Sequence, residues 1–180
     1  MSVKKVIVLR HSLKGCDGEL TNEGISLAIK VGERIKKHHK IAFAISSPEG
    51  RAIKTAGIIT EHNCPIQIAE EVGIPEKDMT TVLKLFGKLG NKSLATYCAE
   101  GKDVEEKLSE YGRKAWEVIM EASAERNCVL VVGHEVLIGA IGAAATNQTQ
   151  LIMNAVFDEC NGFIVTVEDD QVTAVRLFKN

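Results

Sequence analysis

Short apolar runs recur along the chain and predict buried strands. Residues 3–9 and 41–45 each contain a continuous apolar stretch, and residues 128–132 form the most apolar run. Continuous apolar runs of this length are typical of strands that are covered on both faces. A shorter run at residues 66–69 predicts a further strand. We therefore expect a sheet whose inner strands are buried.

Amphipathic stretches separate these strands. Apolar positions recur at helical spacing over residues 25–35, 52–59 and 137–144. Ser47-Pro48 is expected to begin the second of these helices, because serine caps helices well and proline suits the first helical position. Strands that alternate with helices predict an α/β fold in which a mostly parallel sheet lies between two helical layers, a three-layer αβα sandwich.

The C-terminal part of the chain shows a different period. Apolar and polar residues alternate over residues 163–167 and again over 172–178, with the polar residues 168–171 between them. Alternation with a period of two predicts two antiparallel strands joined by a hairpin. We therefore expect an antiparallel edge strand on an otherwise parallel sheet.

The middle of the chain is predicted to be helical. Residues 102–124 carry apolar positions roughly along one helical face, whereas residues 76–100 fit either a helix or a loop excursion. No internal repeat, low-complexity segment or linker rich in proline and glycine divides the sequence. At 180 residues, we expect a single domain over 1–180, with a helical excursion at about 76–126.

Composition and charge exclude several classes of function. Apolar residues make up 45% of the chain and charged residues 26%, which excludes wholesale disorder. The 22 basic and 24 acidic side chains leave a net charge of −2. The chain therefore has no overall positive charge that would attract nucleic acid or an anionic membrane surface. The apolar run at 6–9 is too short for a signal peptide, and the odd number and wide spacing of the five cysteines argue against a disulfide framework. We expect a cytoplasmic protein.

Basic and imidazole side chains follow three of the predicted strands. Arg10-His11 ends the first strand, Arg51 follows Ser46-Ser47-Pro48 at the end of the second, and Gly133-His134 ends the run at 128–132. Ligands of open parallel sheets bind outside the carboxyl ends of the strands. Two arginines and two histidines beside helix N-termini suit a compact dianion, for which phosphate is the obvious candidate.

Each of these residues alone also has a simpler interpretation. An arginine or histidine at a strand end is often only solvated, and a histidine after an apolar strand is often structural. Their order and their common position at strand ends favour the phosphate site. Zinc-ligand spacing is incomplete, because His62 and Cys64 lack further ligands and Ile138 interrupts the zinc-protease motif that begins at His134. We expect neither a metal nor a cofactor.

Four ordered blocks give the chain a resemblance to a known family. They are Arg10-His11, Leu20-Thr21-Asn22-Glu23-Gly24, Ser46-Ser47-Pro48-Glu49-Gly50-Arg51-Ala52-Ile53-Lys54-Thr55-Ala56 and Val132-Gly133-His134-Glu135. Over roughly residues 3–146, the chain resembles the histidine phosphatase superfamily, which also contains the cofactor-dependent phosphoglycerate mutases. The short length and the Gly-His-Glu block look most like the small phosphohistidine phosphatases of the SixA type. The resemblance implies a phosphoglycerate mutase-like fold.

The resemblance also implies a role for each residue of the strand ends. His11 would be the nucleophile that carries a transient phosphoryl group, while Arg10, Arg51 and His134 would bind the phosphoryl oxygens. A neutral imidazole suits the first role, because its ordinary pKa is about 6.5. Phosphoryl transfer depends mainly on positioning and charge neutralisation, which two guanidiniums and a protonated imidazole supply without a metal.

The chain departs from the family pattern at two places. Ser12 stands where the family usually has glycine after the nucleophilic histidine, so its side chain would either crowd the site or donate to phosphate. Family mutases and broad phosphatases also use an acidic residue to protonate the leaving oxygen. The candidates in the expected region are Glu70, Glu71, Glu76 and Asp78, among which the sequence does not choose. If none of them serves, a phosphohistidine substrate is favoured, because its imidazole leaving group needs a strong acid less.

The sequence supports one principal function and two alternatives. The first is a metal-independent phosphatase that works through phospho-His11 on a phosphohistidine protein or a phosphorylated small molecule. The second is a sugar-phosphate phosphatase or mutase of the same superfamily, which a large basic cap insertion would favour. The third is a non-catalytic binder of phosphate or phosphoprotein, which Ser12 and the missing acid favour. No nucleic-acid or membrane partner is expected for any of them.

Overall fold

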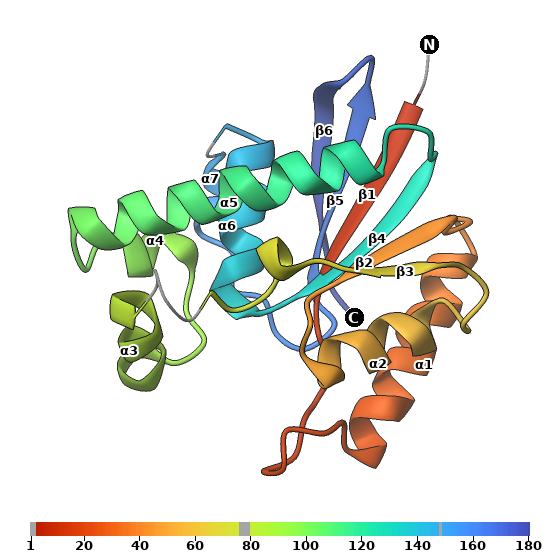
Figure 1. Cartoon of the computed structure of the whole chain (residues 1–180), viewed down its shortest axis with the longest axis horizontal. Coiled ribbons are helices and arrows are strands. Elements are labelled where there is room, and N and C mark those ends of the chain that lie inside the picture. Colours follow the sequence, from red (N-terminus) through yellow and green to blue (C-terminus); the bar gives the residue numbers. More distant parts are fainter. Residues whose placement is uncertain (1–2, 76–79, 148) are drawn as a thin grey trace.

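The computed structural model describes residues 3–75, 80–147 and 149–180, which form a layered α/β fold (Figure 1). Among these residues, a six-stranded sheet has the strand order β3-β2-β4-β1-β5-β6. The pairs β1–β4, β4–β2 and β2–β3 are parallel, whereas β1–β5 and β5–β6 are antiparallel. The mostly parallel sheet with an antiparallel edge is therefore confirmed. The strands are β1 (Val3–Arg10), β2 (Phe43–Ser46), β3 (Ile66–Ile68), β4 (Cys128–Gly133), β5 (Gly162–Glu168) and β6 (Gln171–Phe178).

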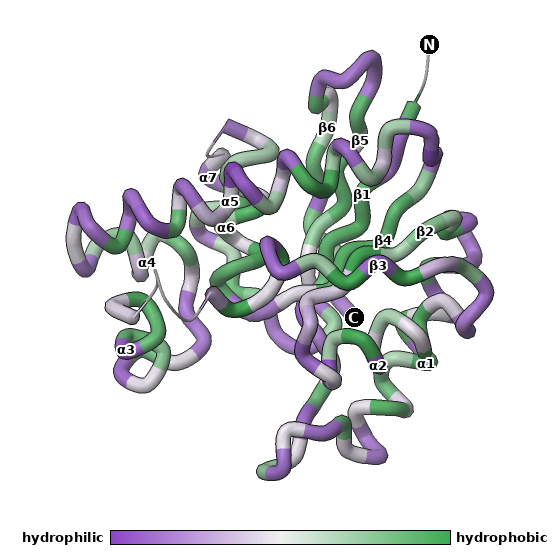
Figure 2. The backbone as a smooth tube through the Cα atoms, viewed as in Figure 1, coloured by the Kyte–Doolittle hydropathy of each residue, from purple (hydrophilic) through white to green (hydrophobic). Residues whose placement is uncertain are grey.

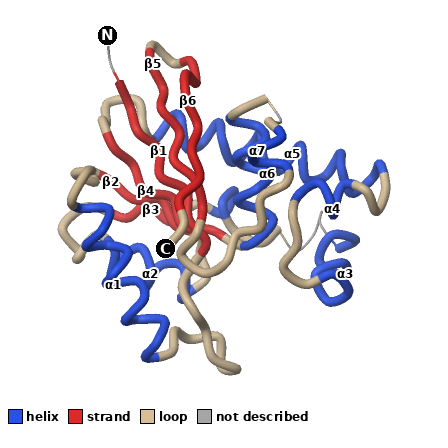
Figure 3. The backbone as a smooth tube through the Cα atoms, turned by 180° about the vertical axis from the view of Figure 1, so that it is seen from behind, coloured by secondary structure: helices blue, strands red, loops and turns tan. Residues whose placement is uncertain are grey.

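Helices cover both faces of the sheet, as the three-layer prediction requires (Figures 1 and 3). Helices α1 (Asn22–Lys36) and α2 (Gly50–Ile59) pack on one face. Helices α5 (Lys102–Ala122) and α6 (Glu135–Ala145) pack on the other face. The connections between parallel strands therefore place the start of α2 and the start of α6 at the same edge of the sheet.

The central strands bury side chains on both faces. In β1, Val6 and Val8 join the core under α5 and α6, whereas Ile7 and Leu9 join the core under α1 and α2. Successive side chains of a strand point to opposite faces, so a strand between two helical layers must be apolar at every position. Figure 2 shows the hydrophobic residues concentrated along the inner strands and α6. None of the described helices combines the length and the apolar composition that crossing a bilayer requires.

The helical excursion lies on the α5 side of the molecule. The predicted helix at 102–124 is confirmed as α5, and the ambiguous stretch before it contains α3 (Thr80–Leu89) and α4 (Leu94–Cys98). Val82, Leu94 and Tyr97 anchor these short helices in the core beneath α5 and α6. The remaining short elements are a 3₁₀ turn at Glu70–Val72 and α7 (Gln150–Met153).

The start of α2 differs from the prediction. The helix begins at Gly50 with Glu49 as its N-cap, so the expected beginning at Ser47-Pro48 is wrong. The Ser47 N–H donates to the Val132 carbonyl at 3.0 Å, which extends the pairing with β4 by one residue. This pairing holds the Ser47 hydroxyl at the sheet edge, where it contacts His134 instead of capping the helix.

Gly112 marks the closest approach of α5 to α6 and provides a test of the packing. A Cβ atom at this position would lie 2.1 Å from the Ala140 carbonyl oxygen. The backbone of α6 cannot rotate out of the way as a flexible side chain could. We therefore expect Gly112→Ala to lower the free energy of unfolding by about 1–3 kcal/mol. Gly87→Ala in α3 is the matched control, since its Cβ would meet nothing within 4 Å. Urea unfolding measures both, and a Gly112→Ala protein as stable as wild type would contradict the packing.

Candidate active site

The parallel pairing of β1, β4 and β2 brings three strand ends to one edge of the sheet. Arg10, the last residue of β1, pairs with Gly133 of β4, and β2 pairs with the other side of β4. The His11 N–H continues this ladder and donates to the Gly133 carbonyl at 3.0 Å. The rings of His11 and His134 consequently lie edge to face, with centroids 5.1 Å apart. The expected convergence of the strand-end residues is present.

Hydrogen bonds determine which nitrogen of His11 carries the hydrogen. Nδ1 lies 2.7 Å from the Ser12 carbonyl oxygen, and Arg51 Nε donates to Nε2 at 3.1 Å. A carbonyl only accepts and a guanidinium only donates, so the hydrogen is on Nδ1 and the lone pair is on Nε2. Burial lowers the pKa of His11 to about 3. The hydrogen bond to the Ser12 carbonyl raises this pKa, whereas the nearby charges of His134 and Arg51 lower it further. The ring therefore presents an unprotonated Nε2 at neutral pH.

His134 is held from the opposite side by a carboxylate. Its Nε2 lies 2.8 Å from Glu49 Oε2 and 2.7 Å from Ser47 Oγ. Because a carboxylate accepts, Nε2 carries the hydrogen and Nδ1 accepts from Arg51 Nη2 at 3.3 Å. Burial alone would raise the pKa of Glu49, but the hydrogen bonds from His134 and Ser47 lower it to about 2. Glu49 was not predicted as a site residue, and its one sequence signal is its place between Ser47 and Arg51.

Arg51 lies in the first turn of α2 and joins the two rings. Its Nε and Nη2 donate to His11 and His134, respectively. The start of α2 adds the positive end of the helix dipole to this region. Together, His11, Arg51 and His134 form a compact cationic site that contains a nucleophilic nitrogen.

Arg10 is arranged differently from Arg51. Its side chain is buried, Nη1 donates to the Phe157 carbonyl at 3.1 Å, and Nη2 contacts Glu135 at 2.8 Å and Glu159 at 3.0 Å. Its Nε is buried and has no hydrogen-bond partner among the described residues. The charge of Arg10 contributes to the lowered pKa of His11. Arg10 thus lies beside the site with most of its guanidinium occupied by carboxylates.

Glu70 and Glu71 are the predicted acidic residues within the described part of the chain, and neither belongs to the close group of His11, His134 and Glu135. Glu70 and Glu71 line a groove of about 600 Å³ together with Tyr111 of α5, and His11, Arg51 and His134 are not part of its lining. Glu76 and Asp78 lie outside the described residues. Glu135 is the acidic side chain whose carboxylate oxygen lies within 4.8 Å of ring nitrogens of both His11 and His134. Its sequence signal is its position directly after His134, at the start of α6.

Ser12 neither crowds the site nor reaches toward it. Its hydroxyl donates to the Gly24 carbonyl of α1 at 2.7 Å, and its N–H donates to Thr55 Oγ1 of α2 at 3.0 Å. A Cβ atom at Gly24 would lie 2.2 Å from the Leu13 carbonyl oxygen, so glycine permits this close approach of α1. The serine therefore ties the loop after β1 to both neighbouring helices, and its hydroxyl is committed to that contact.

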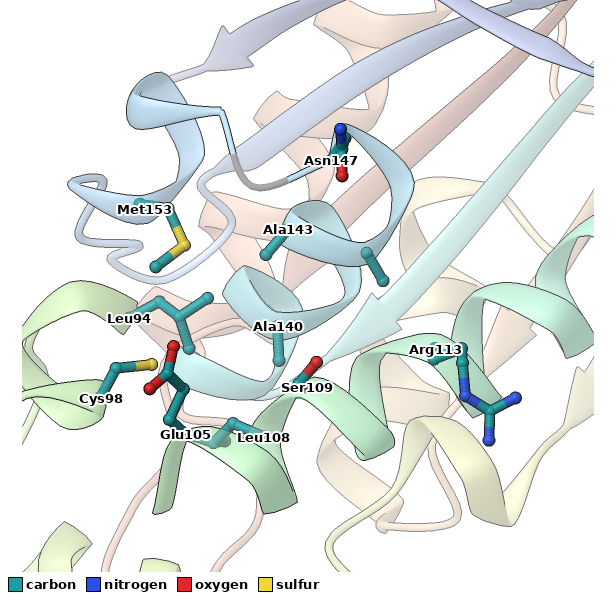
Figure 4. Close-up of a pocket in the computed structure, with 11 residues that line it drawn as sticks. Leu94, Cys98, Glu105, Leu108, Ser109, Arg113, Ala140, Ala143, Asn147 and Met153 are labelled. Atoms are coloured by element: carbon teal, nitrogen blue, oxygen red, sulfur yellow. The ribbon is translucent and has the colours of Figure 1, made fainter. Parts of the chain in front are cut away.

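A separate cavity lies between α4, α5, α6 and α7 (Figure 4). It measures about 230 Å³, and Leu94, Ala140, Ala143 and Met153 supply much of its apolar lining. Arg113 at its margin forms an ion pair with Glu117. The cavity contains none of the strand-end residues, so we place the candidate site at the sheet edge.

Comparison with known proteins identifies the family. Residues 10–180 match the model of the histidine phosphatase superfamily (branch 1). The chain therefore belongs to this superfamily, and it is a phosphatase. No curated protein matches the chain.

Solved structures with a similar fold include phosphatases and a mutase. A phosphoserine phosphatase mutant from Entamoeba histolytica, in complex with phosphoserine, is 19% identical, with a TM-score of 0.62 and 96% of each chain covered. Phosphoglycerate mutase from Bacillus anthracis str. Sterne is 17% identical, with a TM-score of 0.67 and coverage of 98% of this chain and 93% of that one. The protein histidine phosphatase SixA complexed with tungstate is 18% identical, with a TM-score of 0.59 and coverage of 97% and 94%. These likenesses confirm the phosphoglycerate mutase-like fold.

The lowered pKa of His11 gives a direct test of the site. We expect the ring to stay neutral at about pH 5, where an ordinary imidazole is protonated, because burial opposes its charge. Nitrogen NMR of the imidazole rings measures this, and His11→Ala assigns the signal. Protonation near the ordinary pKa of about 6.5 would contradict the described environment.

The same pKa difference links folding to pH. His11 of the unfolded chain takes up a proton near its ordinary pKa of about 6.5, whereas the folded chain does so only near about 3. The unfolded state binds more protons in this window, so the contribution is fully present above the unfolded pKa and is lost as pH falls toward 3. The free energy of unfolding of wild type should therefore fall more steeply across this window than that of His11→Ala.

Proposed function

We propose that this chain is a metal-independent phosphatase that transfers the phosphoryl group of its substrate to His11 and then to water. The observation that carries the proposal is the position of Arg51, which directs one donor at His11 Nε2 at 3.1 Å and another at His134 Nδ1 at 3.3 Å. The lone pair of His11 Nε2 can attack a phosphoryl group bound at this point. The Arg51 guanidinium can neutralise the negative charge of the phosphoryl oxygens.

The charges around this point support a reaction that needs no metal. Arg51 supplies a planar, delocalised guanidinium whose donors match the geometry of phosphoryl oxygens, and Arg10 lies beside it. Glu49 holds Nε2 of His134 and keeps its ring oriented with Nδ1 toward the phosphoryl group. Because phosphoryl transfer depends on positioning and charge neutralisation, these groups supply what the transition state requires.

The reaction proceeds in two steps. In the first, the lone pair of His11 Nε2 forms a bond to phosphorus as the bond to the leaving group breaks, and the Nδ1–H bond to Ser12 keeps the ring oriented. In the second, the water oxygen bonds to phosphorus and releases a proton to solvent, while the N–P bond breaks and its electron pair returns to Nε2. Inorganic phosphate then leaves.

The substrate we propose is a phosphohistidine protein or a phosphomonoester. Similar folds occur in the protein histidine phosphatase SixA and in a phosphoserine phosphatase that binds phosphoserine, which supports both classes. The sugar-phosphate phosphatase or mutase remains the alternative. The non-catalytic binder loses its two supports, because the Ser12 hydroxyl is committed to Gly24 and a carboxylate, Glu135, lies at the site. The cytoplasmic location remains a prediction.

Hydrolysis of p-nitrophenyl phosphate in the presence of a chelator tests this function. We expect wild type to release p-nitrophenolate and His11→Ala to lose activity by on the order of 10⁴-fold or more, because the nucleophile is gone. His38→Ala, an exposed histidine after α1, is the matched control and should retain the wild-type rate.

Two outcomes would contradict the proposal. Turnover that survives in His11→Ala would exclude phospho-His11, and turnover that returns only after a metal is added back would exclude the metal-independent reaction. Phosphate-dependent thermal stabilisation without turnover of any phosphate ester or phosphohistidine protein would favour the binder instead.

A further inference from the structure

Three carboxylates contact the residues around the proposed phosphoryl position. Glu135 and Glu159 both pair with Nη2 of Arg10, at 2.8 Å and 3.0 Å. Glu49 contacts the other ring of the site, with Oε2 2.8 Å from Nε2 of His134. At this edge of the sheet, two arginines therefore stand beside three acidic side chains. The site is built for one phosphoryl group, but the charge around it is not strongly positive.

The protein itself uses most of the binding capacity of Arg10. The side chain is 8% exposed, Nη1 donates to the Phe157 carbonyl at 3.1 Å, and Nη2 is shared by the two glutamates. The buried Nε has no hydrogen-bond partner among the described residues, which leaves this N–H to a bound ligand. Because two carboxylates already offset the guanidinium charge, Arg10 cannot also neutralise a second anionic group on a substrate.

A ligand that approaches from solvent meets the carboxylates more readily than the Arg10 guanidinium. The side chains of Glu135 and Glu159 are 30% and 28% exposed, and that of Glu49 is 24% exposed. The pKa of Glu49 is lowered to about 2, so it carries its charge at neutral pH. Charges that are partly buried are screened by salt much less than charges on the open surface. These carboxylates therefore act on the part of a substrate that extends beyond the phosphoryl group.

We propose that this arrangement selects phosphorylated substrates whose remaining part is neutral or cationic, and that Glu159 sets much of the selection. The proposal rests on the phospho-His11 function above, and it names the substrate class of the same site. Arg51 compensates the charge of the phosphoryl group itself. A second anionic group on the same small molecule is repelled by the carboxylates, whereas an ammonium group is attracted.

Glu159 is the carboxylate whose charge can be removed without altering the reacting groups. Glu49 holds the ring of His134, and Glu135 has an oxygen within 4.8 Å of ring nitrogens of both histidines. Glu159 lies outside that close group, and its carboxylate pairs with Arg10. The loop that carries Glu159 is held by backbone, because the Cys160 N–H donates to the Arg10 carbonyl at 3.2 Å. Loss of the Glu159 charge should therefore leave the loop in place.

The selection separates the substrate classes considered for this chain. A phosphoglycerate carries a carboxylate and a sugar bisphosphate carries a second phosphate, so both meet the repulsion. The imidazole that leaves a phosphohistidine bears no negative charge, so phosphohistidine and esters of neutral or amino alcohols are admitted. The inference thus favours the phosphatase over a mutase that acts on phosphoglycerates.

The experiment measures how strongly three small alkyl phosphates compete with p-nitrophenyl phosphate in wild type. O-phosphoethanolamine carries a cationic group, glycerol 3-phosphate a neutral one and 3-phosphoglycerate an anionic one. We expect the inhibition constant to rise in that order, with at least about a 10-fold difference between the first and the last, because unit charges in a half-buried site interact strongly. The difference should shrink as salt is added, because salt screens the carboxylates.

Variants of Glu159 distinguish charge selection from a structural role. In Glu159→Gln, the ratio of the inhibition constants of 3-phosphoglycerate and O-phosphoethanolamine should fall by about 3–10-fold. Glu159→Asp keeps the charge and should retain most of the wild-type ratio. Glu61→Gln is the matched control, because it makes the same change in net charge at an exposed carboxylate that pairs with Lys36 beyond the far end of α2. Its ratio should equal that of wild type.

Three results would overturn the inference. They are a wild type that binds 3-phosphoglycerate as tightly as O-phosphoethanolamine, a Glu159→Gln protein with an unchanged ratio, and an equal fall of the ratio in Glu61→Gln. A residue that only orients Arg10 would shift all three inhibition constants together and leave the ratio unchanged.

The failure of the proposed function gives a different result. Wild type would then release no p-nitrophenolate through His11, and competition could not be measured. Thermal stabilisation by the same three alkyl phosphates would still report their order of binding. That order, and its change in Glu159→Gln, decides the charge selection independently of turnover.

Discussion

The parallel pairing of β4 with β1 on one side and β2 on the other is the constraint on which the site depends. It places the ends of three strands in register, with Arg10 opposite Gly133 and Ser46 opposite Val132. His11 and Ser47 then each form one further backbone bond to β4, which fixes their side chains beside His134. The apolar residues on both faces of these strands stabilise the pairing, so burial of the sheet is what holds the polar site together.

Charge balance around this edge explains most of the remaining arrangement. Arg51 donates to the two histidines and forms no ion pair with a carboxylate among the described residues, whereas Arg10 is buried against two carboxylates. Glu49 contacts Nε2 on the far side of His134, which leaves Nδ1 directed toward Arg51. Glu135 lies on the near side of the histidines, with a carboxylate oxygen within 4.8 Å of ring nitrogens of both His11 and His134.

The fold and the cationic half of the site were predictable from sequence because each depends on a local pattern. Continuous apolar runs indicate strands with two covered faces, and Arg10-His11, Arg51 and His134 stand directly after such runs. The acidic half was not predictable in this way, because the contact between Arg10 and Glu135 joins residues 125 positions apart. The direction of the Ser12 hydroxyl likewise depends on the close approach of α1 at Gly24, which no local pattern reveals.

A phosphoryl group trapped on His11 is the central claim of this account, and rapid quenching tests it most directly. Wild type mixed with p-nitrophenyl phosphate, quenched in alkali within the first turnover and digested, should yield a peptide with an acid-labile phosphoryl group on His11. The same peptide from His11→Ala should carry none. A phosphoryl group on another residue, or complete turnover with no label on His11 at any quench time, would contradict the account.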